Sequence, residues 1–188
     1  MTCTSTPAKK NMLAQAPTES LSDGSCIRPA HADELPVIIG LIRALAEYEK
    51  LLDAVVLEPA ELHAQLFGDR PGAEVVLVVR GDAEVVGMAL FFHNFSTFLG
   101  RRGLYLEDLF VLPSERGRGY GKALMVYLAR LAIARGCGRF EWAVLDWNTP
   151  AIDFYRSLGA LPQDEWTVQR VTGAALAQLA ATRPDAGT

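Results

Sequence analysis

The chain has 188 residues, of which 50% are hydrophobic and 21% are charged, and its formal net charge is −4. This length and composition indicate one globular domain with a hydrophobic core, and they disfavour nucleic acid as a partner, because nucleic-acid-binding domains carry a basic patch. The three cysteines and three histidines show neither metal-ligand nor CxxC spacing, so we expect no metal, no disulfide framework and a cytoplasmic protein.

Residues 1–24 are predicted to be a flexible leader. They are rich in Ser, Thr, Pro and Ala and contain no apolar run of the length that a secretory signal needs. No stretch of the chain approaches the ~20 apolar residues that cross a bilayer, so no membrane association is expected. The domain is expected to span residues 25–182, with a short tail over residues 183–188.

The first elements of the domain are a strand and two helices. Residues 26–30 are predicted to form a short strand. Apolar side chains then recur with helical spacing over residues 35–46. A second helix is predicted over residues 59–67, where Pro59 occupies the first helical position.

From Glu74 the apolar side chains follow the pattern of strands. Residues 75–79 and 84–92 are rich in β-branched and aromatic residues, and the segment 80–82 (Arg-Gly-Asp) between them is typical of a hairpin turn. Residues 95–103 are predicted to be a loop, and residues 104–112 the central strand.

A glycine-rich loop follows the central strand and leads into a helix that ends at Gly136. The remaining predicted elements are a strand over 140–145, a helix over 151–158, a strand over 166–171 and a helix over 173–181. The order of these elements predicts a mixed α/β fold with a β-α-β crossover around the glycine loop.

The glycine loop itself, RGRGYG over residues 116–121, predicts a site for an anionic group. Alternating glycines allow close approach to the backbone, and the first N–H groups of the following helix have no helical acceptor, which suits a phosphate. It is not a Walker A loop, because Arg116 stands where that motif needs glycine and Ala123 where it needs Ser or Thr. It also lacks the G-x-G-x-x-G spacing of a dinucleotide site. The alternative is a plain surface turn.

With these motifs in place, the chain resembles the GCN5-related N-acetyltransferase (GNAT) superfamily, and in particular its diamine and thialysine acetyltransferase branch. The resemblance covers residues 27–173. It is carried by Ile27-Arg28-Pro29-Ala30, residues 45–50 (LAEYEK), Tyr105-Leu106-Glu107-Asp108, the loop at 116–121, residues 144–148 (VLDWN), Phe154-Tyr155 and Gly159-Ala160.

The resemblance implies a mixed, mostly antiparallel central sheet that is splayed at the cofactor site, with helices on both faces, in a homodimer. It implies transfer of an acetyl group from acetyl-CoA, as co-substrate, to a primary amine. The implied cofactor-binding residues are Leu109, Phe110, Val111, Arg116, Gly117, Arg118, Gly119, Tyr120, Gly121, Lys122, Asn148 and Tyr155. Tyr48 and Glu49 match positions on the substrate side.

Two side chains are candidates for the proton transfers. An alkyl ammonium has a pKa near ~10 and must lose a proton before it attacks a thioester, so we expect Glu107 to accept that proton through a water. Tyr155, at the position of the family's tyrosine acid, is expected to protonate the leaving thiolate. The alternatives are that Glu107 and Asp108 form a solvated edge or a structural ion pair, and that Tyr155 is a core aromatic beside Phe154.

The substrate is the least specified part of the resemblance. Diamine acetyltransferases of this branch carry an acidic residue before the central strand, whereas this chain has Ser96 and Thr97. Hydroxyl groups suit a zwitterionic amino-acid head, so we predict direct transfer, in a ternary complex, to an amine of the thialysine, ornithine or lysine type. The alternatives are a polyamine acetyltransferase, a protein-lysine or N-terminal acetyltransferase, and a sensor that binds acetyl-CoA without turnover.

Overall fold

A six-stranded sheet forms the centre of the first of two compact units, which meet in sequence at Ala143 and Val144. The structure is a computed structural model that describes residues 14–183. The strands are adjacent in chain order: β1 (Glu19–Ser20), β2 (Cys26–Pro29), β3 (Glu74–Arg80), β4 (Glu84–Ser96), β5 (Arg101–Val111) and β6 (Phe140–Trp142). Neighbours are antiparallel except for β5 and β6, which are parallel. The predicted mixed, mostly antiparallel α/β fold is confirmed.

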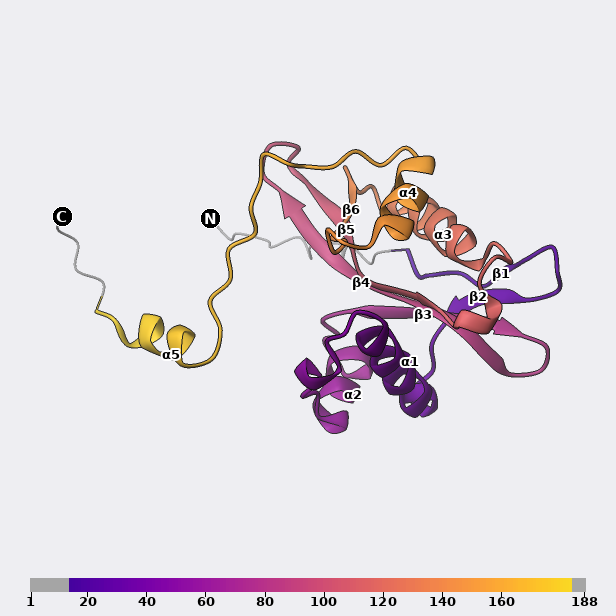
Figure 1. Ribbon diagram of the computed structural model, residues 1–188, viewed down its shortest axis with the longest axis horizontal. Helices are drawn as coiled ribbons and strands as arrows, with labels where there is room; N and C mark the ends of the chain where they lie inside the picture. The colour runs from indigo at the N-terminus through magenta and orange to yellow at the C-terminus, as the bar shows by residue number, and fades with distance from the viewer. Residues whose placement is uncertain (1–13, 184–188) are drawn as a thin grey trace, which may run out of the picture. The chain divides into compact units, whose positions relative to one another are not determined.

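Helices cover both faces of this sheet (Figure 1). They are α1 (Leu35–Tyr48), α2 (Pro59–Phe67) and α3 (Tyr120–Ala134), with single turns η1 (Ala32–Glu34), η2 (Leu52–Ala54) and η3 (Pro113–Glu115). Leu77 of β3 packs in one cluster with Ile38 of α1 and Leu66 of α2. Because side chains alternate along a strand, the fully buried Val76 and Val78 point to the other face, where α3 contacts β4 and β5. Burial on both faces explains the continuous apolar runs of β3 and β4.

The β4–β5 hairpin is longer than predicted. The predicted loop at residues 95–103 shrinks to residues 97–100, because His93 to Ser96 pair with Leu104 to Arg101. The strands therefore continue through a polar stretch that sequence propensity alone assigns to a loop.

The second unit, from Val144 onward, contains α4 (Thr149–Ser157) and α5 (Gly173–Ala181). The predicted strand over residues 166–171 is wrong, since this segment has no strand conformation. Trp166 and Val168 are 74% and 82% exposed, so the apolar pattern that suggested a strand has no buried face here.

Residues 14–24, which fall within the leader predicted from composition, form hydrogen bonds and an ion pair with α3 and its C-cap, Arg135. The Tyr127 hydroxyl donates to the Pro17 carbonyl at 2.6 Å, Arg130 pairs with Glu19 at 2.9 Å, and the buried Arg135 donates to the Ala14 carbonyl at 2.8 Å. We call residues 14–25 the N-terminal segment. The rest of the predicted leader and residues 184–188 of the predicted tail lie outside the described residues, and the domain limits of 25–182 stay a prediction.

Candidate active site

The glycine loop joins η3 to α3 and is open on its outer side. Gly117 and Gly119 have φ angles of 79° and 87°, in the left-handed region that favours glycine. A Cβ atom built on either residue would meet nothing within 4 Å. The glycines are therefore required by backbone conformation, and the space above them is available to a ligand.

The start of α3 provides donors for an anion. Gly119 is the N-cap and supplies no side-chain cap, and the first helical hydrogen bond runs from the Ala123 N–H to the Gly119 carbonyl at 2.9 Å. The N–H groups of Tyr120, Gly121 and Lys122 precede that bond and have no acceptor within the helix. These groups at a helix N-terminus, with the exposed Lys122 beside them, fit a pyrophosphate such as that of acetyl-CoA.

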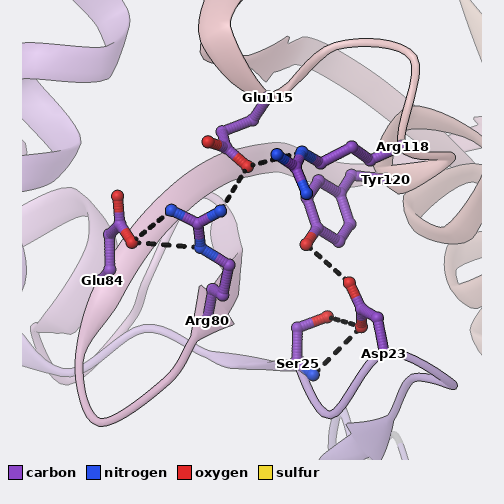
Figure 2. Close-up of polar contacts among 7 residues, drawn as sticks. All are labelled: Asp23, Ser25, Arg80, Glu84, Glu115, Arg118 and Tyr120. Atoms are coloured by element: carbon purple, nitrogen blue, oxygen red, sulfur yellow. Dashed lines mark hydrogen bonds and ion pairs between the residues drawn. The ribbon is translucent and has the colours of Figure 1, made fainter.

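Arg118, a predicted cofactor-binding residue, is part of a chain of ion pairs (Figure 2). Its Nε lies 3.2 Å from Oε2 of the buried Glu115, and Nη1 of Arg80 lies 3.0 Å from the same oxygen. Arg80 also pairs with Glu84 at 2.6 Å. The ion pair with Glu115 is made through Nε, and 56% of the Arg118 side chain is exposed, so the guanidinium remains able to donate to an anion.

Arg116, also predicted to bind the cofactor, connects the loop to the end of α1. Its guanidinium carbon lies 4.7 Å from the ring centroid of Tyr48 and 5.7 Å from that of Phe110. Its Nε donates to the Val111 carbonyl at 3.2 Å. The structure thus brings a predicted cofactor residue against a predicted substrate residue, Tyr48, through a cation–π contact.

The central strand β5 changes its pairing next to the loop. Its parallel pairing with β6 ends at Leu106 and Trp142, which leaves Leu109, Phe110 and Val111 paired with β4. On the β4 side, Leu90 faces Asp108 and Phe91 faces Leu106, so Glu107 is the extra residue of a β-bulge. A bulge redirects side chains locally, which allows Glu107 and Asp108 to lie near each other despite the alternation of a regular strand.

An acidic group forms where the bulge meets the end of α1. Burial, with smaller contributions from Glu107 and Glu49, raises the pKa of Asp108 to about 6. Burial also raises the pKa of Glu49, which is the C-cap of α1. The carbonyl end of a helix carries partial negative charge, so the three carboxylates and this helix end together favour a cationic ligand.

Ser96 and Thr97, the predicted substrate hydroxyls, lie away from this acidic group. Ser96 is six residues further along β4 than Leu90, the partner of Asp108, and at ~3.3 Å per residue the separation along the strand is about 20 Å. Ser96 is 7% exposed and its Oγ accepts the Leu99 N–H at 3.3 Å, which closes the hairpin turn. Within the first unit, the structure therefore does not bring these hydroxyls together with Glu49, Glu107 and Asp108.

Asn148 and Tyr155 belong to the second unit and are described within it. Asn148 is 7% exposed and caps α4, where its side-chain oxygen accepts the Ala151 N–H at 3.4 Å. Tyr155 is half-buried, and its ring centroid lies 5.2 Å from that of Phe154. Their predicted roles near the thiol stay predictions.

Sequence reasoning gave little weight to Asp108 and did not single out Glu115 or Asp23. Their positions depend on a bulge, on a buried turn and on a contact between distant segments, none of which has a local sequence signal. No group of three or more His, Cys, Asp or Glu residues within residues 14–183 is arranged to hold a metal ion. Within the same residues, no helix has both the length and the hydropathy to cross a membrane.

Comparison with known proteins agrees with this geometry. The profile of the Acetyltransferase (GNAT) family matches residues 41–160. The chain is 38% identical over 164 residues to a thialysine N-epsilon-acetyltransferase of Sus scrofa, an alignment that covers 82% of this chain and 96% of that protein. It is 31% identical to an L-ornithine N5-acetyltransferase of Arabidopsis thaliana, covering 81% of this chain and 86% of the other.

A solved structure shares the fold. An integron cassette protein from the mobile metagenome of V. cholerae superposes with a TM-score of 0.71 at 29% identity, covering 84% of this chain and 98% of that one. The matched profile includes α3, the glycine loop and the bulge of β5. The chain therefore belongs to the Acetyltransferase (GNAT) family and is an acetyl-transferring enzyme.

Proposed function

We propose that this protein transfers an acetyl group from acetyl-CoA to a primary amine of a small, amino-acid-like molecule, by direct transfer in a ternary complex. The observation that carries the proposal is the Arg116–Tyr48 contact. It links an anion-binding loop to the end of α1, where Glu49 contributes to the acidic group with Glu107 and Asp108. One unit thus holds a site suited to a pyrophosphate beside a site suited to an ammonium.

Acetyl-CoA, when bound, supplies a thioester whose carbonyl carbon is open to attack by a neutral amine. The chain's part is to bind its pyrophosphate on the N–H groups of Tyr120, Gly121 and Lys122, with added charge from Arg118. The backbone of Leu109 to Val111, beyond the end of the β5–β6 pairing, would hold the pantetheine arm.

The acidic group handles the proton of the amine. It first attracts the ammonium, since Asp108 lies close enough to both Glu107 and Glu49 to interact with their charges. The exposed Glu107 then accepts a proton from the nitrogen through a water, which leaves the neutral amine that the reaction needs. Asp108, with its raised pKa, is the second carboxylate able to accept a proton near neutral pH. Tyr155 would donate its hydroxyl proton to the departing sulfur.

The amino-acid preference is supported by the relatives that act, by name, on thialysine and ornithine. The predicted hydroxyl pair does not support it, since Ser96 lies about 20 Å along the strand from the position of Asp108 and Thr97 follows Ser96 in the turn. The acidic group itself favours a second candidate function, acetylation of a polyamine, because three carboxylates also suit a dication. We further propose that the protein is a cytoplasmic homodimer. Light scattering of the purified protein tests the oligomeric state.

Thiol release from acetyl-CoA tests the proposal. The purified chain is offered thialysine, ornithine, lysine, spermidine and putrescine, and kcat/KM is compared. We expect thiol release, with a higher kcat/KM for thialysine, ornithine and lysine than for spermidine and putrescine. A higher kcat/KM for spermidine would instead support the second candidate function, acetylation of a polyamine. Binding of acetyl-CoA with no thiol release on any amine would instead identify a sensor.

A further inference from the structure

The two side chains on either side of Gly119 are each held by a carboxylate (Figure 2). Arg118 pairs with Glu115, which belongs to the turn just before the loop. The Tyr120 hydroxyl donates to Oδ2 of Asp23 at 2.6 Å, and Asp23 comes from the N-terminal segment. Asp23 lies outside residues 41–160, which match the family profile.

Hydrogen bonds from Ser25 hold the Asp23 side chain in position. Its Oδ1 accepts the Ser25 N–H at 3.0 Å and the Ser25 hydroxyl, and Ser25 is 1% exposed. The Ser25 hydroxyl, the Tyr120 hydroxyl and the Ser25 N–H together lower the pKa of Asp23 to about 2. Asp23 is therefore ionised near neutral pH, and it accepts a charge-assisted hydrogen bond from Tyr120.

Tyr120 is the residue through which this bond acts on the loop. It is the first residue of α3, it is 3% exposed, and it stands between Gly119 and Gly121. Glycines give the backbone on either side large conformational freedom, and Gly119 supplies no side-chain cap. The buried Tyr120 side chain is thus an anchor for a short piece of backbone whose N–H groups must all point one way to hold a pyrophosphate.

We propose that Asp23 is a positioning residue for the cofactor. By holding the Tyr120 hydroxyl, it keeps the first turn of α3 and its N–H groups in the orientation that binds the pyrophosphate. This inference rests on the proposed function, since it requires that the loop binds coenzyme A.

A purely structural role makes a different prediction, and the chain offers a matched control. Tyr127 lies on the same helix, is 1% exposed, and donates its hydroxyl to the Pro17 carbonyl of the same N-terminal segment, also at 2.6 Å. Tyr127→Phe therefore removes an equivalent tie between the segment and α3, but two turns away from the glycine loop. If these ties only stabilise the fold, Tyr120→Phe and Tyr127→Phe have the same effects.

The experiment measures the Kd of coenzyme A by calorimetry and the thermal midpoint Tm for the full chain and for Asp23→Asn, Tyr120→Phe, Tyr127→Phe and the double variant Asp23→Asn/Tyr120→Phe. We expect Asp23→Asn and Tyr120→Phe each to weaken binding about tenfold, the size of one charge-assisted hydrogen bond. The double variant is expected to bind no more weakly than either single one, because both substitutions remove the same charge-assisted interaction. Tyr127→Phe is expected to stay within about twofold of wild type even where its Tm falls.

Two results would overturn the inference and leave the proposed function standing. Unchanged Kd values in Asp23→Asn and Tyr120→Phe would show that the contact does not act on the site. Equal weakening in all three single variants would show a general loss of stability instead. Failure of the wild-type chain to bind coenzyme A would remove the proposed function itself, and the inference with it. Kinetics give a second readout, since the KM for acetyl-CoA should rise with kcat nearly unchanged.

Discussion

Asp108→Asn is expected to stabilise the folded protein at neutral pH while it impairs the site. Burial, together with Glu107 and Glu49, raises the pKa of Asp108 from 3.8 to about 6. Ionising this carboxylate in the folded state therefore costs free energy that the unfolded chain does not pay. Asn carries no charge and avoids that cost, whereas its effect on hydrogen bonding is the same at every pH.

The size and the pH range follow from this pKa. Well below pH 3.8 the carboxyl is protonated in both states, and it makes no pH-dependent difference. Between pH 4 and pH 6 the unfolded state loses its proton first, so the folded state binds more protons and stability falls as pH rises. At ~1.4 kcal/mol per pH unit the difference between variant and wild type should grow to about 3 kcal/mol and level off above pH 6.

Urea unfolding at pH 4, 5, 6, 7 and 8 measures this difference. The exposed Asp69→Asn serves as the control, and it should stay within about 0.5 kcal/mol of wild type throughout. A difference between Asp108→Asn and wild type that is constant with pH, or that shrinks as pH rises, would refute the assignment of a raised pKa. Asp108→Asn should also raise the KM for the amine, because the Asp108 carboxylate attracts the ammonium even though its burial lowers the stability of the folded protein.

Four further variants test other parts of the site and the core. Glu107→Gln should slow transfer most near neutral pH and less above pH 9, where the amine deprotonates unaided; an unchanged pH–rate profile would exclude it as the base. Tyr155→Phe should lower kcat with little change in acetyl-CoA affinity, and the reverse pattern would count against its role as an acid. Arg116→Ala should raise the KM of both substrates by removing the contact with Tyr48; an effect on acetyl-CoA alone would show that the two sites are independent. Leu128→Ala, at a fully buried position of α3, should lower the free energy of unfolding by about 2–5 kcal/mol in urea titrations, and a loss below 1 kcal/mol would contradict its place in the core.

The parts of the fold with strong local signals could be predicted from the sequence. The stripe from Leu35 to Ala46 lies within α1, the apolar run from Val75 to Val79 lies within β3, and the glycines at 117–121 lead into α3. These elements follow from periodicity and from backbone freedom, which are properties of neighbouring residues. The strand predicted at 166–171 failed because an apolar pattern does not say whether a partner strand or a buried face exists.

The chemistry of the site depends more on contacts between distant segments. The bulge at Glu107 depends on how β4 and β5 pair, and it decides which carboxylates are neighbours. Tyr120 and Asp23 are 97 residues apart in sequence, and neither belongs to a motif that predicts the other. The separation of Ser96 from Asp108 likewise depends on the register of the β4–β5 hairpin, which the sequence does not specify.

The burial of β3 on both faces has a consequence for how the sheet finds its register. A strand with one polar face resists a one-residue slip, because the slip would expose its apolar side chains, but β3 has no such face to protect it. Two features fix the register instead. In the turn, Gly81 adopts φ 56° and Arg80 pairs with Glu84 both in the ladder and through their side chains. A β-bulge between Val78 and Val79 then shifts the register for the rest of the strand. Since Arg80 also pairs with Glu115, the Arg80–Glu84 closure that aligns the end of this strand also places a cation against the turn that precedes the glycine loop.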